Sequence, residues 1–361
     1  MRMKNVIPLK FLVFPSCLKG IFLLCVCQFV FLKIHGQRDP EFISSFKDSP
    51  HLTFEIASRN QNFVIRNPDV ENIQLTYQPN TSSNFLTSFD YRWISLSIGL
   101  FSLQASDGDR KGESNQFSFR ASFNGKRFWN SNFIQIFNGY YLANPQIANP
   151  SWNSQNDFYP YRPDLTTTTL FSNFYYCFNP NKFSYRASLF QLDRQERSAG
   201  SFVAGVSLRM HRMLSDSSQS LIPVELAPQF KPEYRLISQS ATNINFNVGY
   251  VHTFVYRHSW FLTLYFVPGI SVQNSYYLSE DKQIRNKPNQ TTGVSEFRFI
   301  LGYNGDRWYS GISSYAISFA GKRDLGVWVD DNYSWFRMFV GYRFKPLDRS
   351  RLPRFFDKIG L

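Results

Sequence analysis

The sequence predicts an all-β protein, an antiparallel transmembrane β-barrel, from three observations. It contains 38 Phe, 20 Tyr and 7 Trp among 361 residues, yet its mean hydropathy is slightly negative at −0.31. Aromatic and polar residues alternate with a period of two, as in strands that have one apolar and one polar face. The connections between these strands are either short or long, as in barrels with short periplasmic turns and long extracellular loops.

The same features exclude two other classes of protein. A membrane-spanning helix needs about 20 consecutive apolar residues, and such a stretch occurs only near the N-terminus. A bundle of membrane helices is therefore excluded. The aromatic content also excludes an intrinsically disordered chain, since disordered segments contain few aromatic residues.

The first residues predict a cleaved signal peptide over 1–36. A basic segment without acidic residues precedes a short apolar run, Gly20–Leu32, and Gly36 follows it, as in secretory signals. The alternatives are an uncleaved anchor and a lipoprotein signal at Cys27. Cleavage would leave Cys177 as the only cysteine, so we expect no internal disulfide. It would also lower the formal charge from +13 to about +8, because five basic residues and no acidic ones are removed.

We expect the barrel over residues 70–344, with the apolar, largely aromatic face of each strand toward lipid and the polar face toward the lumen. In residues 243–250, for example, Ile244, Phe246 and Val248 alternate with asparagines. About 14 strands are expected, at 70–78, 82–90, 93–102, 115–123, 127–139, 165–178, 183–193, 201–212, 221–228, 242–255, 260–273, 295–303, 307–318 and 333–344. Twelve is the alternative, with 70–78 and 221–240 assigned otherwise, because two prolines weaken strand 221–228.

The segments that flank the barrel have simpler patterns. Residues 37–69 are expected to form a periplasmic segment or plug, or an extra strand around Leu52–Ile56. Phe344 ends the last strand with an aromatic residue, and the basic tail 345–361 is expected to extend into the periplasm.

Five short turns and four long polar segments separate the strands. Asn124-Gly125 and Asn304-Gly305 lie between β-rich runs and predict type I′ hairpin turns, since Asn-Gly tolerates positive φ. Three more short turns are expected at 90–93, 178–183 and 256–260. With the N-terminus in the periplasm, all five turns fall on the periplasmic side. The long segments, expected outside the cell, are 103–114, 140–164, 275–294 and 319–332.

Several segments resemble a family of outer-membrane proteins of Bacteroidota type known only as domain of unknown function 4421. The resemblance covers roughly residues 50–345 and rests on Leu75-Thr-Tyr-Gln-Pro-Asn80, Tyr91-Arg-Trp-Ile-Ser-Leu-Ser-Ile-Gly99, Gly139-Tyr-Tyr-Leu142, Arg162-Pro-Asp-Leu165, Phe183-Ser-Tyr-Arg-Ala187 and Gln195-Glu-Arg-Ser-Ala-Gly-Ser201. It implies a location in the outer membrane of a Gram-negative cell. It implies no activity, cofactor or catalytic residue.

The sequence offers little catalytic chemistry. The five histidines are scattered and no paired metal-ligand motif occurs, so we expect no metal and no cofactor. We expect no enzyme. The alternative, a barrel lipase or acyltransferase, would depend on a pair such as His252 with Thr253 or His258 with Ser259.

The more informative pattern is charge on the expected inner face. The residues expected to face the lumen are Arg120, Arg186, Arg209, Glu296, Arg298, Arg337 and Arg343. A network of these groups could simply stiffen the wall. The functional hypothesis is an Arg-bearing lumen that passes or binds small anionic or lipidic solutes, because a narrow low-dielectric tube focuses the field of its charges.

Two other functions stay open at this point. The chain could be a structural or assembly component that docks partners through its loops and tail, or it could be the barrel enzyme named above. The expected partners are outer-membrane lipid and lipopolysaccharide, whose phosphates suit a basic chain, and the barrel-assembly machinery during biogenesis. A small solute fits the first hypothesis. Nucleic acid does not suit an exported barrel.

Overall fold

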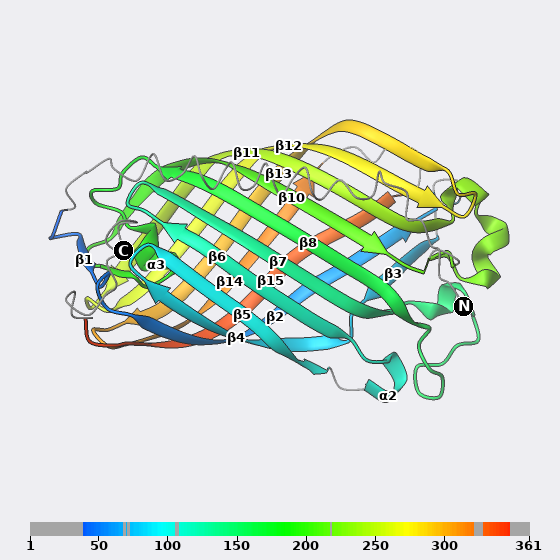
Figure 1. Cartoon of the computed structure of the whole chain (residues 1–361), viewed down its shortest axis with the longest axis horizontal. Coiled ribbons are helices and arrows are strands. Elements are labelled where there is room, and N and C mark those ends of the chain that lie inside the picture. The colour runs from blue at the N-terminus through cyan, green and yellow to red at the C-terminus, as the bar shows by residue number, and fades with distance from the viewer. Residues whose placement is uncertain are drawn as a thin grey trace, which may run out of the picture. The chain divides into compact units, whose positions relative to one another are not determined.

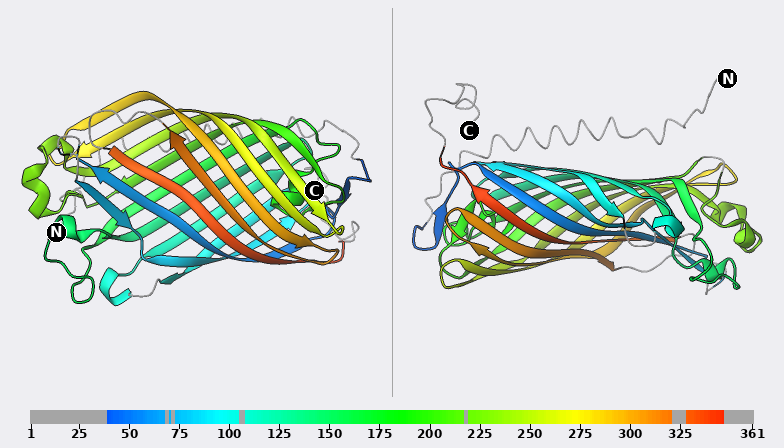
Figure 2. Two further views of the ribbon diagram at one scale, coloured as in Figure 1. Left: turned by 180° about the vertical axis from the view of Figure 1, so that it is seen from behind. Right: turned by 90° about the horizontal axis from the view of Figure 1, so that it is seen from below.

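A computed structural model describes residues 39–67, 70, 73–104, 108–216, 219–320 and 328–346. The expected signal peptide lies outside the described residues, as does all of the expected tail except Lys345 and Pro346. Within the described ranges, no helix is long and apolar enough to cross a membrane. The strands run obliquely side by side around a closed antiparallel barrel (Figures 1 and 2).

In the described part of the chain, twelve strands form the ring: β2 (His51–Arg66), β4 (Thr81–Tyr91), β5 (Ile94–Gln104), β6 (Asn115–Asn124), β7 (Phe128–Leu142), β8 (Tyr161–Cys177), β10 (Ala199–Leu214), β11 (Leu236–Tyr256), β12 (Trp260–Ser279), β13 (Ile284–Asn304), β14 (Trp308–Ala320) and β15 (Trp328–Arg343). β15 pairs antiparallel with β2 from Trp328↔Arg66 to Arg343↔His51, and this ladder closes the barrel. We call the end where β2 begins and β15 ends the turn end, and the opposite end the loop end.

The expected count of 14 strands is wrong. Residues 51–66 form β2, so the barrel begins before residue 70. Residues 183–193 contain the helix α3 (Tyr185–Leu189), which Ser184 caps by accepting a hydrogen bond from the Ala187 amide, and the start of the short strand β9 (Asp193–Gln195). Residues 221–228 lie largely in the 3-10 helix η3 (Val224–Gln229), because two prolines remove the amide donors that a strand needs.

The expected strand 70–78 is reduced to β3 (Gln74–Gln78) at the loop end. β3 pairs with β2 through Phe63↔Tyr77 and with β7 through Tyr77↔Leu142. β3 lies in line with β4, which pairs with the part of β2 from His51 to Ala57. The alternative of twelve strands has the right number, but it lacked β2 and retained 183–193.

The five expected turns all lie at the turn end, but the Asn-Gly turns are not type I′. Neither Asn-Gly pair has a residue with positive φ; Arg257 and His258 in the β11–β12 turn do. The Gly125 amide donates to the Phe128 carbonyl, and Gly305 donates likewise to Trp308, while Asn124 pairs with Trp129 and Asn304 with Tyr309. The expected turn 178–183 begins a much longer connection. The expected loop 275–294 is mostly strand, since β12 ends at Ser279 and β13 begins at Ile284.

The two faces of the wall follow the alternation of the sequence. On β11, Phe246 and Val248 are exposed, whereas Asn245 and Asn247 are buried. The inner face is less polar than expected, because many rings also point inward and are buried. They include Trp129, Phe137, Tyr175, Phe261, Tyr265, Tyr309, Tyr315 and Phe339.

Inserted segments explain these inward rings. At the turn end, the β8–β10 connection, residues 178–198, turns into the barrel and is called the plug. All five residues of α3 are buried. Phe183, Tyr185 and Leu189 pack against inward rings of the wall. β9 of the plug pairs with β1 (Ile43–Ser45).

A second segment fills the loop end. Residues 219–235, called the lid, contain η3 and the 3-10 helix η4 (Pro232–Tyr234). Leu221, Ile222, Leu226 and Phe230 are buried there against inward side chains such as Phe63, Phe137, Tyr140 and Met213. The remaining connections include α2 (Gly108–Lys111) and η2 (Pro145–Ile147). Both ends of the lumen are thus filled by the protein's own side chains.

Candidate functional site

A cavity of about 80 Å³ lies in the lumen next to the plug residues Leu189 and Phe190. Each enclosed water needs at least roughly 10–15 Å³ of such space, so the cavity has room for several waters or a small solute. We call it the chamber. It is lined by Glu55, Ala57, Arg59, Arg120, Trp129, Ser131, Phe133, Phe171, Asn173, Leu189, Phe190, Arg298, Tyr315, Tyr333, Trp335 and Arg337.

Among the described residues, the chamber carries four guanidinium groups and one carboxylate. Glu55 Oε2 accepts a hydrogen bond from Arg337 Nη1 at 3.0 Å, and Glu55 Oε1 accepts one from Arg120 at 3.2 Å. Ser88 also donates to Glu55, at 2.8 Å. The only carboxylate that the described residues place on the chamber wall is therefore already shared between two cations.

Arg59 lacks such a partner. Its Nε and Nη1 atoms are buried and have no hydrogen-bond acceptor among the described residues. Its guanidinium lies 4.8 Å from the centroid of the Phe133 ring, so one face of the cation is covered. Buried donors in native proteins are nearly always satisfied. Arg59 thus offers a cation whose donors need an acceptor from a ligand or from water.

Arg298 is held by rings. Its guanidinium carbon lies 4.7 Å from the ring centroid of Tyr315, and the centroids of Tyr265 and Trp335 are 5.6 and 5.8 Å away. No carboxylate forms an ion pair with Arg298 in the described ranges. The charge of Arg298 is thus stabilised by aromatic faces.

Glu296, two residues before Arg298, is satisfied by hydroxyl groups. Tyr175 donates to Glu296 Oε1 at 2.7 Å, and Tyr315 and Tyr265 donate to Oε2 at 3.3 and 3.4 Å. The carboxylate is buried. Three phenols thus occupy the acceptor positions that an arginine could otherwise use.

The residues expected to face the lumen are divided among three places. Arg120, Arg298 and Arg337 line the chamber, and Glu296 lies beside it. Arg209 points inward from β10, 5.9 Å from the Phe319 ring. The other two belong to the plug region. Arg186 lies on α3 and not on a strand, and Arg343 binds the plug from the end of β15.

Sequence reasoning missed Glu55 and Arg59. Both lie on β2, within residues 37–69, whose structure the sequence left open. The available signal was the alternation Thr53-Phe54-Glu55-Ile56-Ala57. It extends beyond Leu52–Ile56 and places charged and small residues on one face.

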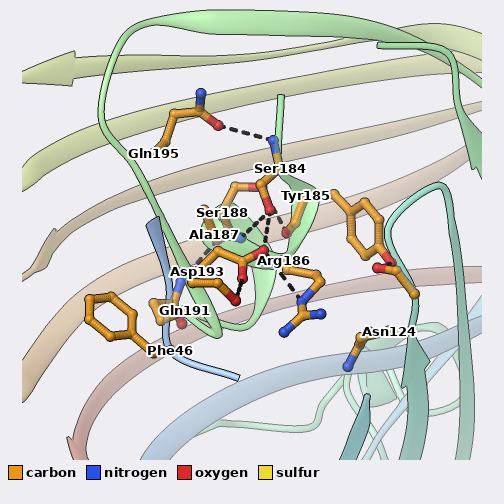
Figure 3. A network of polar contacts seen from close by, with 12 residues as sticks. Phe46, Asn124, Ser184, Tyr185, Arg186, Ala187, Ser188, Gln191, Asp193 and Gln195 are labelled. Carbon is orange, nitrogen blue, oxygen red and sulfur yellow. Dashed lines mark hydrogen bonds and ion pairs between the residues drawn. The ribbon is translucent and has the colours of Figure 1, made fainter. Parts of the chain in front are cut away.

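Asp193 organises the plug (Figure 3). Its carboxylate accepts hydrogen bonds from Ser184 at 2.6 Å and from Ser45 at 2.8 Å, and Arg186 lies 3.4 Å away. Arg343 donates to the Gln191 carbonyl at 2.7 Å. The plug is therefore fixed both by its own polar contacts and by contacts with the wall.

The two expected catalytic pairs lie in different places. His252 lies on the outer face, where its ring packs 4.4 Å from that of Phe254. Thr253 points inward and bonds to Thr263 at 2.8 Å, so the wall separates it from His252. His258 lies at the turn end, 2.8 Å from Glu196. In the described ranges, no group of three His, Cys, Asp or Glu residues could hold a metal ion.

Comparison with known proteins gives a family and a set of distant barrels. The family described as "Domain of unknown function (DUF4421)" matches residues 37–344. No curated protein matches. The outer membrane protease OmpT from Escherichia coli is 10% identical, with 83% of this chain and 98% of that chain covered and a TM-score of 0.39. The beta domain of the Bordetella autotransporter BrkA is 10% identical, with 82% of this chain and 99% of that chain covered and a TM-score of 0.40. The translocator domain of the autotransporter NalP from Neisseria meningitidis is 9% identical, with 93% of this chain and 98% of that chain covered and a TM-score of 0.36.

Proposed function

The chain belongs to the family described as Domain of unknown function (DUF4421), and we propose that it is an outer-membrane β-barrel that binds a small organic anion in the chamber. In this proposal a cleaved signal peptide exports the chain and the turn end faces the periplasm. The barrel holds the ligand and is not an open channel, because the plug and the lid fill the two ends of the lumen.

The outer surface supports insertion into a membrane. Apolar side chains of the wall are exposed along its strands, among them Phe246, Phe266, Phe297, Leu301 and Met338. A soluble protein rarely exposes so continuous an apolar surface. The closed ladder pairs the strand edges, as a bilayer requires.

The observation that carries the proposal is Arg59, with buried donors that no described acceptor satisfies. A carboxylate ligand could accept these hydrogen bonds in the two-pronged geometry that guanidinium groups favour. Glu55 cannot be the full acceptor for the Arg59 donors, since it already binds Arg120 and Arg337. An entering anion would therefore balance an existing excess of positive charge.

The rings around the chamber support an organic ligand. Phe133, Tyr333 and Trp335 present apolar faces on the same wall as the guanidinium groups. A ligand with a carboxylate and a small flat apolar body would satisfy both kinds of surface. An inorganic anion would leave the rings in contact with water.

Isothermal titration calorimetry on the full chain in detergent tests the proposal, with acetate, benzoate and phosphate as the probes. We expect benzoate to bind more tightly than acetate or phosphate. Arg59→Gln should weaken benzoate by at least about tenfold, since a hydrogen bond to a charged group contributes about 1.5–3 kcal/mol. Arg307→Gln is the matched control, because Arg307 is exposed at a turn outside the chamber.

Two results would overturn the proposal. One is the absence of anion binding to a correctly folded wild-type chain, and the other is equal binding by the Arg59→Gln variant. Heat-modifiable migration after membrane fractionation tests the location separately. Recovery in the soluble periplasmic fraction would contradict an outer-membrane barrel.

A further inference from the structure

The two ends of the barrel differ in charge. At the turn end, the described residues 39–50, 92–93, 125–127, 178–198, 257–259, 305–307 and 344–346 contain eleven Lys and Arg and six Asp and Glu. At the loop end, the described residues 108–114, 143–160, 215–216, 219–235 and 280–283 contain five Lys and Arg and eight Asp and Glu. Among the described residues of the two ends, the excess of positive charge thus lies at the turn end.

Basic residues of the turn end alternate with a belt of outward-facing rings. Arg257 follows Tyr256, Arg307 precedes Trp308 and Lys345 follows Phe344. All of these rings are exposed, Tyr256 by 63% and Trp308 by 60%. Each basic group therefore lies within one residue of a ring on the outer surface.

Rings of the belt pack against one another in two groups on neighbouring strands. Trp260 packs 5.5 Å from Tyr303, and Trp308 packs 4.8 Å from Tyr342, whose centroid lies 5.2 Å from that of Phe344. Exposed Trp and Tyr belts mark the level of lipid headgroups in membrane proteins. The basic residues next to this belt are therefore at the depth where lipid phosphates lie.

Three of these basic residues have no acidic partner. Arg257, Arg307 and Lys345 are exposed and form no ion pair with any described residue. Arg257 instead lies 5.3 Å from the Tyr256 ring. Their side chains are long enough to lie along the apolar belt while the charged groups reach the phosphates.

We propose that the turn end binds the phosphate headgroups of anionic phospholipids in the adjacent leaflet through Arg257, Arg307 and Lys345. Juxtamembrane basic residues are attracted to anionic lipid by about 1 kcal/mol each. The inference rests on the membrane location in the proposed function, but not on the chamber. It adds a contact with lipid phosphates in the leaflet opposite to lipopolysaccharide, whose expected contact stays a prediction.

Tryptophan quenching tests the inference directly, because Trp260 and Trp308 belong to the belt. The full chain is reconstituted in phosphatidylcholine vesicles that contain phosphatidylglycerol, with brominated chains on one lipid or the other. We expect brominated phosphatidylglycerol to quench more strongly at equal content. Arg257→Gln/Arg307→Gln should lower this preference by up to about fivefold for each guanidinium group removed. Lys231→Gln/Lys282→Gln, at the loop end, is the control and should leave it unchanged.

Salt and insertion provide the other readouts. The preference should fall in 1 M NaCl, where the Debye length is about 3 Å. Equal quenching by the two lipids in the wild-type chain would overturn the inference, as would an equal loss in the control variant. Failure of the wild-type chain to insert into either lipid would instead overturn the membrane location, so the two failures are distinguishable.

Discussion

Glu55 of β2 and Arg337 of β15 form a buried ion pair of 3.0 Å across the seam where the first and last strands of the barrel meet. Arg120 of β6 binds the other oxygen of the same carboxylate. One acidic group thus links three strands and balances two of the four cations of the chamber. Closure of the barrel and the charge of the chamber depend on the same residue.

Replacement of Glu55 should therefore be costly. Glu55→Ala leaves Arg337 and Arg120 buried without their carboxylate, and loss of one partner of a buried pair typically lowers stability by about 3–5 kcal/mol. We expect a loss of this size in the free energy of unfolding, measured by urea titration in detergent.

The double variant Glu55→Gln/Arg337→Gln provides the control. It removes one charge of each sign. Its loss of stability should therefore be smaller than the sum of the losses in the single variants Glu55→Gln and Arg337→Gln. Additive losses, or a Glu55→Ala chain as stable as the wild type, would contradict the role assigned to the pair.

The plug should control conductance. We expect the wild-type chain to pass little current in a planar bilayer. Replacement of the plug residues 179–197 and of the lid residues 219–235 by flexible Gly-Ser linkers should open a pore that prefers anions, because guanidinium groups line the chamber. Replacement of the lid alone should leave the conductance low, since the plug still fills the turn end. The reversal potential in a KCl gradient measures this preference.

Asp193→Ala tests the same relationship with a smaller change. Asp193 accepts bonds from Ser184 and Ser45, so its removal should loosen the plug and, in a chain whose lid is also replaced by a linker, raise the frequency of openings. Cation-selective pores in either variant, once heat-modifiable migration has shown that it is folded, would refute a positive lumen.

One contact of the plug should depend on pH. Asp306, in the β13–β14 turn, lies 2.6 Å from Arg194 of the plug, and the hydrogen bond from Arg194 holds the pKa of Asp306 below its ordinary value. Because the folded pKa is lowered, the contact contributes fully above about pH 4, the ordinary range of Asp. The contribution is lost as the pH falls through the lowered pKa.

The size of this effect is limited by exposure. The Asp306 side chain is 82% exposed, so solvent screens the pair to about 0.5 kcal/mol or less. Hydrogen exchange of the plug should be faster in Asp306→Asn than in the wild type at pH 6. The difference between the two should shrink as the pH falls below about 4 and Asp306 of the wild type becomes protonated. A difference that is independent of pH would show that charge is not the cause.

Sequence patterns predicted the wall better than its contents. Alternation placed Phe246 outside and Asn245 inside, because one face must meet an apolar environment and the other the lumen. The same reasoning gave two false crossings, 183–193 and 221–228. Because two extra crossings leave the number of strands even, the tight turns still fell at one end of the barrel. The predicted direction of β10, which lies between the two false strands, was therefore the reverse of the observed one, and an even strand count could not reveal this.

The contents of the lumen depend on contacts between distant segments. Tyr185 of the plug packs 4.4 Å from Trp129 of β7, and nothing local distinguishes such an inward ring from a lipid-facing one. The importance of Glu55 likewise comes from Arg120 and Arg337, which are 65 and 282 residues away in the chain.

The lid should open without unfolding of the barrel. Leu226 and Phe230 are buried in the cluster at the loop end, and truncation of a buried Leu to Ala typically costs about 2–5 kcal/mol. Because the lid has no strand ladder, this loss should appear as local opening. We expect limited proteolysis to cleave Leu226→Ala within residues 219–235 at least tenfold faster than the wild type. Val224→Ala, at an exposed position of the same helix, should be cleaved at the wild-type rate. Equal rates in all three chains would mean that the cluster does not hold the lid.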